Sequence, residues 1–212
     1  MFQESISTYQ LFNVVSTEHI TNLLNYYDNH KSYDTVTMNK ISVDSSMDLC
    51  VEICKSLIPF DVEYQSGNFY EHSGPYLPHT DYRVSQDNTI NVVIPLRSVC
   101  AVPASLVVFD QAYIKDSVTW CLDKPIVYFR INTGVAGNPC DYEVIDLTDT
   151  EVDESLHKNF LSHHNKECFR GLSGSAYPFE VGSAIMFDNR RIHCTSHFVG
   201  TKTGVSLRFK KL

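Results

Sequence analysis

The sequence predicts a mainly β, α+β fold in which helices come first and a pair of stacked sheets follows. The first sixty residues have helical periodicity, and from about residue 61 short β-rich runs alternate with Gly, Pro, Asn and Asp. Short strands separated by turns are typical of a sandwich or a barrel-like sheet pair. At 212 residues the chain has the length of one domain, so we expect residues 1–212 to form a single unit.

Two helices are predicted in the first sixty residues. Ser16 can cap the first, because the residues after it place apolar side chains at helical spacing: Ile20, Leu23, Leu24 and Tyr27. The run Ser45-Ser46-Met47-Asp48 resembles a capping box and opens a second helix. Its inward positions are Met47, Val51, Cys54 and Ile58.

The remainder of the chain reads as β core with one helical insert. The insert is expected at about 132–180, because Thr148-Asp149-Thr150-Glu151 forms another capping box and Val152, Leu156 and Phe160 follow at spacing four. The predicted strands lie near residues 61–66, 68–73, 90–97, 105–110, 126–131, 183–187, 191–198 and 204–210.

Charge and composition argue against several classes of protein. A formal net charge of −8 without a long basic cluster disfavours nucleic acid or an anionic membrane as partner. The longest apolar runs are too short to span a bilayer, and the first residues do not resemble a signal peptide. Seven cysteines without a Cys-x-x-Cys pair indicate reduced thiols, so we expect a cytoplasmic protein. The oligomeric state stays open.

The segment Pro78-His79-Thr80-Asp81 is a candidate metal-binding motif. Residues two apart on an extended strand point to the same face, so His79 and Asp81 can offer a nitrogen and an oxygen to one ion. A distant histidine would complete the two-His-one-carboxylate arrangement that leaves positions open on non-haem Fe(II). His193 and His197 compete for that place, since they are four residues apart and can share one strand face.

The end of the chain predicts an anion-binding residue close to the same site. Strands 191–198 and 204–210 are expected to form a hairpin around residues 199–203, which would bring Arg208 near the distal histidine. An arginine there can bind a carboxylate through two charge-assisted hydrogen bonds.

The order of His-x-Asp, a distal His and an Arg on the last core strand resembles the 2-oxoglutarate/Fe(II)-dependent dioxygenases. The run from Gly182 to His193 is similar to the strand and turn before that family's distal histidine, and Pro78-His79-Thr80-Asp81 is similar to its prolyl-hydroxylase-like branch. The resemblance covers roughly residues 60–210. It implies a double-stranded β-helix, or jelly roll.

The resemblance also implies roles for particular residues. His79, Asp81 and His193 would bind Fe(II), with His193 preferred over His197 because its interval from the preceding turn is the family's usual one. Arg208 would pair with the far carboxylate of 2-oxoglutarate, and the residues that would assist or replace it are Tyr70, which lies nine residues before His79, Ser206 and Lys202.

The activity implied is consumption of O2 and 2-oxoglutarate, giving succinate and CO2 while a second substrate is oxidised. Asp81 favours hydroxylation or desaturation over halogenation, because related halogenases have a small residue there. We expect hydroxylation of a small molecule such as an amino acid or a natural-product intermediate. The alternatives are a prolyl or peptidyl hydroxylase, a nucleic-acid demethylase, which the charge disfavours, and a non-catalytic jelly-roll protein that binds a metal or ligand.

Overall fold

The computed structural model describes residues 7–31, 41–42, 48–76, 78–81, 88–112, 118–121, 128–131, 142–144, 152–169 and 172–212. Within these ranges the largest sheet has six antiparallel strands, and we refer to it as the major sheet. Their order across the sheet is β1 (Tyr9–Leu11), β10 (Ala184–Asp188), β4 (Thr89–Val102), β12 (Val199–Lys211), β3 (Val62–His72) and β2 (Ile41–Ser42).

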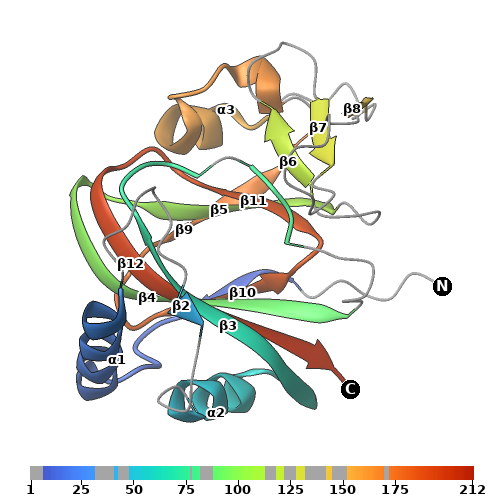
Figure 1. Ribbon diagram of the computed structural model, residues 1–212. Coiled ribbons are helices and arrows are strands. Elements are labelled where there is room, and N and C mark those ends of the chain that lie inside the picture. The colour runs from blue at the N-terminus through green and yellow to red at the C-terminus, as the bar shows by residue number, and fades with distance from the viewer. Residues whose placement is uncertain are drawn as a thin grey trace.

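A second antiparallel sheet, the minor sheet, lies across from the major one (Figure 1). Its order is β11 (Arg191–Thr195), β5 (Ser105–Ala112) and β9 (Gly174–Pro178). A small ladder above it is formed by β6 (Val118–Cys121), β7 (Tyr128–Ile131) and β8 (Tyr142–Val144). Two antiparallel sheets with few helices confirm the predicted mainly β architecture, whereas the winding of a double-stranded β-helix stays a prediction.

Two helices cover the outer face of the major sheet (Figure 1): α1 (Thr17–His30) and α2 (Asp48–Leu57). The Ser16 hydroxyl accepts a hydrogen bond from the His19 amide at 3.3 Å, which confirms the predicted cap. Most of the predicted inward positions are buried and pack on the sheet: Ile20, Leu23, Tyr27, Val51, Cys54 and, just after α2, Ile58. Leu24 is only partly buried, and Cys50 is buried although it was not among the predicted inward positions.

Side-chain alternation along the strands separates three apolar layers. Val92, Ile94, Val205 and Leu207 face the helices, whereas Val93, Ile185 and Phe187 face the minor sheet. The outer face of the minor sheet is covered by α3 (Glu154–Leu156), a π-helical turn (His157–Leu161) and a 3-10 turn (Lys166–Phe169). One of the three apolar layers therefore lies between the two sheets.

The predicted hairpin between residues 191–198 and 204–210 is wrong. β11 pairs with β5 in the minor sheet, whereas β12 pairs with β4 and β3 in the major sheet. The outward side chains explain this, because Ile192 and Cys194 pack under the helical turns whereas Val205 and Leu207 pack under α1 and α2. Strands that bury their outer faces on opposite sides of the molecule cannot belong to one sheet.

Two other boundaries differ from the predicted ones. The ranges 61–66 and 68–73 form one continuous strand, β3, that runs through Gly67. Strand β9 falls inside the range expected to be an insert, 132–180, yet it pairs with β5 along its length. Its sequence, Gly-Ser-Ala-Tyr-Pro, resembles a loop because glycine and proline are poor strand formers.

The helical segment after residue 151 begins later than predicted. Asp153 caps it, since its carboxylate accepts a hydrogen bond from the Leu156 amide at 2.7 Å. The predicted capping box at 148–151 lies outside the described residues. Among the described residues, no helix is both long enough and apolar enough to cross a membrane.

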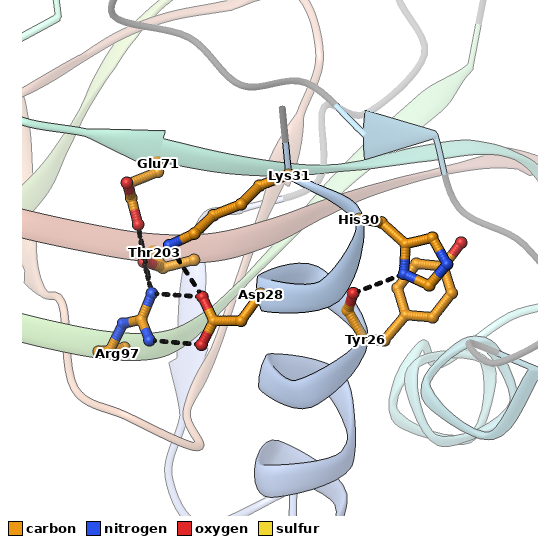
Figure 2. A network of polar contacts seen from close by, with 7 residues as sticks. All are labelled: Tyr26, Asp28, His30, Lys31, Glu71, Arg97 and Thr203. Atoms are coloured by element: carbon orange, nitrogen blue, oxygen red, sulfur yellow. Dashed lines mark hydrogen bonds and ion pairs between the residues drawn. The ribbon is translucent and has the colours of Figure 1, made fainter. Parts of the chain in front are cut away.

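A polar network ties α1 to the major sheet (Figure 2). The Arg97 guanidinium of β4 contacts both Asp28 oxygens at 2.9 and 3.2 Å and Glu71 of β3 at 3.2 Å, while Thr203 of β12 donates to Glu71 at 3.1 Å. The hydrogen bond from Arg97 is the largest cause that lowers the pKa of Asp28. This network of polar contacts therefore connects α1 with strands β3, β4 and β12.

Four histidines gather where the helical turns meet the end of β11. The His163 ring lies 4.0 Å from the His164 ring and 5.4 Å from the His197 ring, measured between centroids, and the His157 Nε2 donates to the His164 carbonyl at 2.9 Å. Burial, followed by the three neighbouring histidines, lowers the pKa of His163 to about 4. Burial also lowers the pKa of His164. The cluster therefore disfavours the protonated forms of His163 and His164.

This cluster predicts acid sensitivity. In the unfolded chain His163 takes up a proton below about pH 6.5, whereas in the folded protein it does so only at about pH 4. The free energy of unfolding therefore falls as the pH is lowered across that interval. Urea denaturation at pH 7.5, 6.0 and 5.0 measures the loss. The variant His163→Gln, which cannot be protonated, is expected to lose less stability than the wild type. Equal losses would show that the cluster is not responsible.

Candidate metal centre

His79 is fixed by the backbone at the free edge of β11. The amide of each of His79 and His193 donates to the carbonyl of the other at 2.9 Å, which makes an isolated antiparallel bridge. The Thr195 amide also donates to the Tyr76 carbonyl at 3.2 Å. The segment before Asp81 therefore continues the minor sheet by a short stretch, and two residues 114 positions apart in the chain (193 minus 79) become neighbours.

The predicted ligands come together at this bridge. Asp81 Oδ1 lies 3.9 Å from His79 Nε2, and Asp81 Oδ2 lies 3.7 Å from His193 Nε2. One nitrogen or oxygen atom from each of the three residues falls within 4.8 Å of the others, a spacing in which one metal ion can contact all of them. Among the described residues, no other group of histidine, cysteine and carboxylate side chains has such a spacing.

The His193 imidazole is held in the orientation that a metal ligand needs. Its Nδ1 donates to the Arg191 carbonyl at 3.0 Å, which leaves the Nε2 lone pair directed at Asp81. Burial is the largest influence on its pKa and lowers it, which disfavours the protonated ring. The Phe187 ring, 4.7 Å away between centroids, covers the His193 ring on the inner side.

His197, the competing candidate, is placed elsewhere. Strand β11 ends at Thr195, so the alternation that would have put residues 193 and 197 on one face does not reach His197. Its amide donates to the Phe160 carbonyl at 2.8 Å, and its ring lies in the histidine cluster described above. The structure thus brings His193, and not His197, to His79 and Asp81.

The predicted keto-acid residues form one row on the inner face of β12. Alternation and the burial of Val205 and Leu207 on the opposite face place Lys202, Gly204, Ser206 and Arg208 in this row. A Cβ atom on Gly204 would lie 2.6 Å from the Tyr70 hydroxyl. The Tyr70 phenol therefore fills the space that a side chain at position 204 would take, between the positions of Lys202 and Ser206. Its burial raises the pKa of the hydroxyl.

The two cations of this row have different surroundings. Arg208 Nη2 lies 3.4 Å from Asp81 Oδ1, so the guanidinium contacts the metal-binding motif itself. The Lys202 ammonium is buried, lies over the Phe179 ring at 4.6 Å and donates to Thr195 Oγ1 at 3.3 Å. No carboxylate among the described residues forms an ion pair with it. Desolvation lowers the pKa of Lys202 to about 7.

Sequence reasoning missed two residues of the site. Asn91 of β4 donates from Nδ2 to Asp81 Oδ2 at 3.0 Å, and the Tyr76 ring meets the His79 ring edge-on at 4.5 Å between centroids. A usable signal existed for Asn91, since it is the one amide in the apolar run Ile90-Asn91-Val92-Val93-Ile94. Tyr76 gave no signal, because its contact depends on a bend between β3 and His79.

Comparisons with known proteins identify the fold. No family model and no curated protein matches the sequence. Among solved structures, the viral collagen prolyl hydroxylase vCPH from Paramecium Bursaria Chlorella virus-1 superposes with a TM-score of 0.54 at 8% identity, covering 97% of this chain and 96% of the other. The non-haem α-ketoglutarate-dependent epimerase SnoN from nogalamycin biosynthesis gives a TM-score of 0.54 at 9% identity, covering 96% and 76%.

A third similar structure is that of HygX from Streptomyces hygroscopicus with nickel and 2-oxoglutarate bound. It gives a TM-score of 0.52 at 8% identity, and the match covers 96% of this chain and 82% of HygX. At such identities the likeness concerns the fold. The chain therefore has the fold of the 2-oxoglutarate- and Fe(II)-dependent oxygenases.

Proposed function

We propose that this protein is a 2-oxoglutarate- and Fe(II)-dependent oxygenase whose metal is held by His79, Asp81 and His193. The observation that carries the proposal is the meeting of these three side chains, drawn from distant parts of the chain, between the sheets of this fold. SnoN has been solved in complex with Fe3+, α-ketoglutarate and nogalamycin RO, and HygX with nickel and 2-oxoglutarate. These complexes support the same ligands here.

The residues present fit a ferrous ion. Two neutral imidazoles and one carboxylate are the donor set of non-haem Fe(II) oxygenases, and three donors leave coordination positions open. A bound iron would supply the activation of O2 with 2-oxoglutarate as co-substrate. The chain's own contribution is to hold the His193 tautomer through Arg191, to fix His79 by the backbone bridge, and to exclude water with Phe187 and Tyr76.

The far carboxylate of the keto acid requires a cation, and β12 offers two. Arg208 is the residue predicted from the sequence, yet its guanidinium contacts Asp81 at 3.4 Å. The Lys202 ammonium donates a hydrogen bond to Thr195. Thr195 and His193 lie on the same face of β11, two residues and therefore about 7 Å apart along the strand. That separation is comparable to the length of an extended five-carbon dicarboxylate.

We assign the anchor to Lys202, with Tyr70 and Ser206 beside it, and keep Arg208 as the alternative. A buried ammonium that lacks a carboxylate is costly, and a bound anion would remove that cost. Arg208 lies at the end of the row that is nearest the proposed metal ligands. Its role would then be to orient the Asp81 carboxylate. The two assignments differ in which substitution abolishes keto-acid binding.

The primary substrate proposed is a small molecule, and the proposed reaction is its hydroxylation. HygX has been solved with hygromycin B bound, and SnoN with nogalamycin RO, so this fold accommodates such molecules in other proteins. The net charge of −8 disfavours a nucleic-acid substrate. A peptidyl hydroxylase is the second candidate, because the viral prolyl hydroxylase matches almost the full length of both chains.

The test is a visible spectrum recorded without oxygen. We expect a weak charge-transfer band when both Fe(II) and 2-oxoglutarate are added to apo-protein, and neither compound alone should produce it. A protein that remains folded and shows no band would overturn the proposal in favour of a non-catalytic protein. Succinate release in the presence of small molecules or proline-rich peptides then separates the two substrate classes.

A further inference from the structure

Side-chain contacts hold the Asp81 carboxylate beyond the backbone bridge. That bridge joins His79 to His193, and Asp81 lies two residues further along the chain. Two of these side-chain contacts come from the major sheet, across the interior: Asn91 Nδ2 lies 3.0 Å from Oδ2, and Arg208 Nη2 lies 3.4 Å from Oδ1.

Asn91 and Arg208 are directly opposite each other on neighbouring strands. The register pairs Arg208 of β12 with Asn91 of β4, and both side chains project between the sheets. Each contacts a different oxygen of Asp81, so both oxygen atoms of the carboxylate are held in place. Each oxygen also faces the Nε2 of a different histidine, at 3.9 and 3.7 Å.

The Asn91 side chain is unfavourable for the stability of the strand in which it lies. It is fully buried in an otherwise apolar strand, and its Oδ1 has no hydrogen-bond partner within the described part of the chain. Leaving a buried acceptor unpaired is destabilising, so an apolar residue of the same size would stabilise the strand. Among the described residues, the amide makes its hydrogen bond to Asp81.

We infer that Asn91 is a positioning residue that holds the Asp81 carboxylate for metal binding. The inference rests on the metal centre proposed above and adds a residue to it. Asn91 acts through Asp81 and does not itself touch the ion. Partners that orient metal ligands typically contribute a factor of about 10–100 to metal affinity.

The test is a titration of apo-protein with Co(II), followed by its visible spectrum. Asn91→Leu keeps the volume and removes the donor, and we expect its Co(II) dissociation constant to rise by about 10–100-fold. The midpoint of urea unfolding of the apo-protein should stay the same or rise, because an unpaired amide oxygen has been removed. Weaker metal binding without lost stability is the combination that a purely structural role does not produce.

Val93→Ala is the matched control, since Val93 lies two residues along the same strand on the same face but packs in the apolar core. It should lower stability and leave the Co(II) dissociation constant within about twofold. If Asn91→Leu does not fold, Asn91→Ala repeats the measurement. Unchanged Co(II) affinity in a folded Asn91 variant overturns the inference. Wild-type protein that binds no Co(II) overturns the proposed function instead.

Discussion

We expect the substitution His193→Ala to abolish metal binding while His197→Ala leaves it intact. His193 supplies a nitrogen 3.7 Å from Asp81 Oδ2, whereas His197 lies in the outer histidine cluster. Loss of a ligand, and not merely of a partner that orients one, should raise the Fe(II) dissociation constant by more than about 100-fold. Anaerobic titration of the apo-proteins with Fe(II) measures the difference.

The same pair of variants separates loss of a ligand from general damage. Both remove one imidazole from positions only four residues apart, and their circular dichroism spectra should remain alike. Succinate formation from 2-oxoglutarate should disappear with His193→Ala and persist with His197→Ala. The reverse result would exchange the two histidines and contradict the geometry of the bridge at His79.

The second large effect is expected at Lys202. Lys202→Met removes the ammonium and keeps most of the volume, so the dissociation constant of 2-oxoglutarate should rise on the order of 100-fold, the loss typical of a buried charge pair. The Fe(II) dissociation constant should not change. Titration of the charge-transfer band with 2-oxoglutarate gives both values. Loss of keto-acid binding in Arg208→Gln but not in Lys202→Met would instead support the anchor predicted from the sequence.

The assignment to Lys202 also fixes the direction of a pH dependence. Its pKa in the folded protein is lowered to about 7 by desolvation, and the keto acid binds the protonated form. Affinity for 2-oxoglutarate should therefore weaken above about pH 7, by up to about tenfold per pH unit. In the absence of keto acid, the stability of the fold should rise between about pH 7 and the ordinary lysine pKa, because there the unfolded chain holds the extra proton.

Local sequence patterns were sufficient for the helices and for two of the three candidate metal ligands. The Ser16 cap and the spacing of Ile20, Leu23 and Tyr27 depend on contacts within a few residues, so the sequence alone predicts them. The same holds for His79 and Asp81, since any extended segment puts residues two apart on one side.

Pairing between strands could not be predicted from the sequence. It depends on which apolar segments of the chain pack against the outer face of each strand. The hairpin predicted for residues 191–210 failed for this reason, and β9 was missed since its five residues do not look like a strand. The choice between His193 and His197 likewise needed the point at which β11 ends. Periodicity cannot supply it, since both residues fit the same alternation.

The sequence by itself determined the fold class, the two N-terminal helices and the candidate ligands in their chain order. Only the tertiary structure decided that His79 lies beside His193, that Lys202 is buried next to Thr195, and that Asn91 reaches Asp81. The physical reason is the same in each case. These contacts join residues seven or more positions apart in the chain, and their geometry is set by the packing of two whole sheets and not by the propensities of either segment.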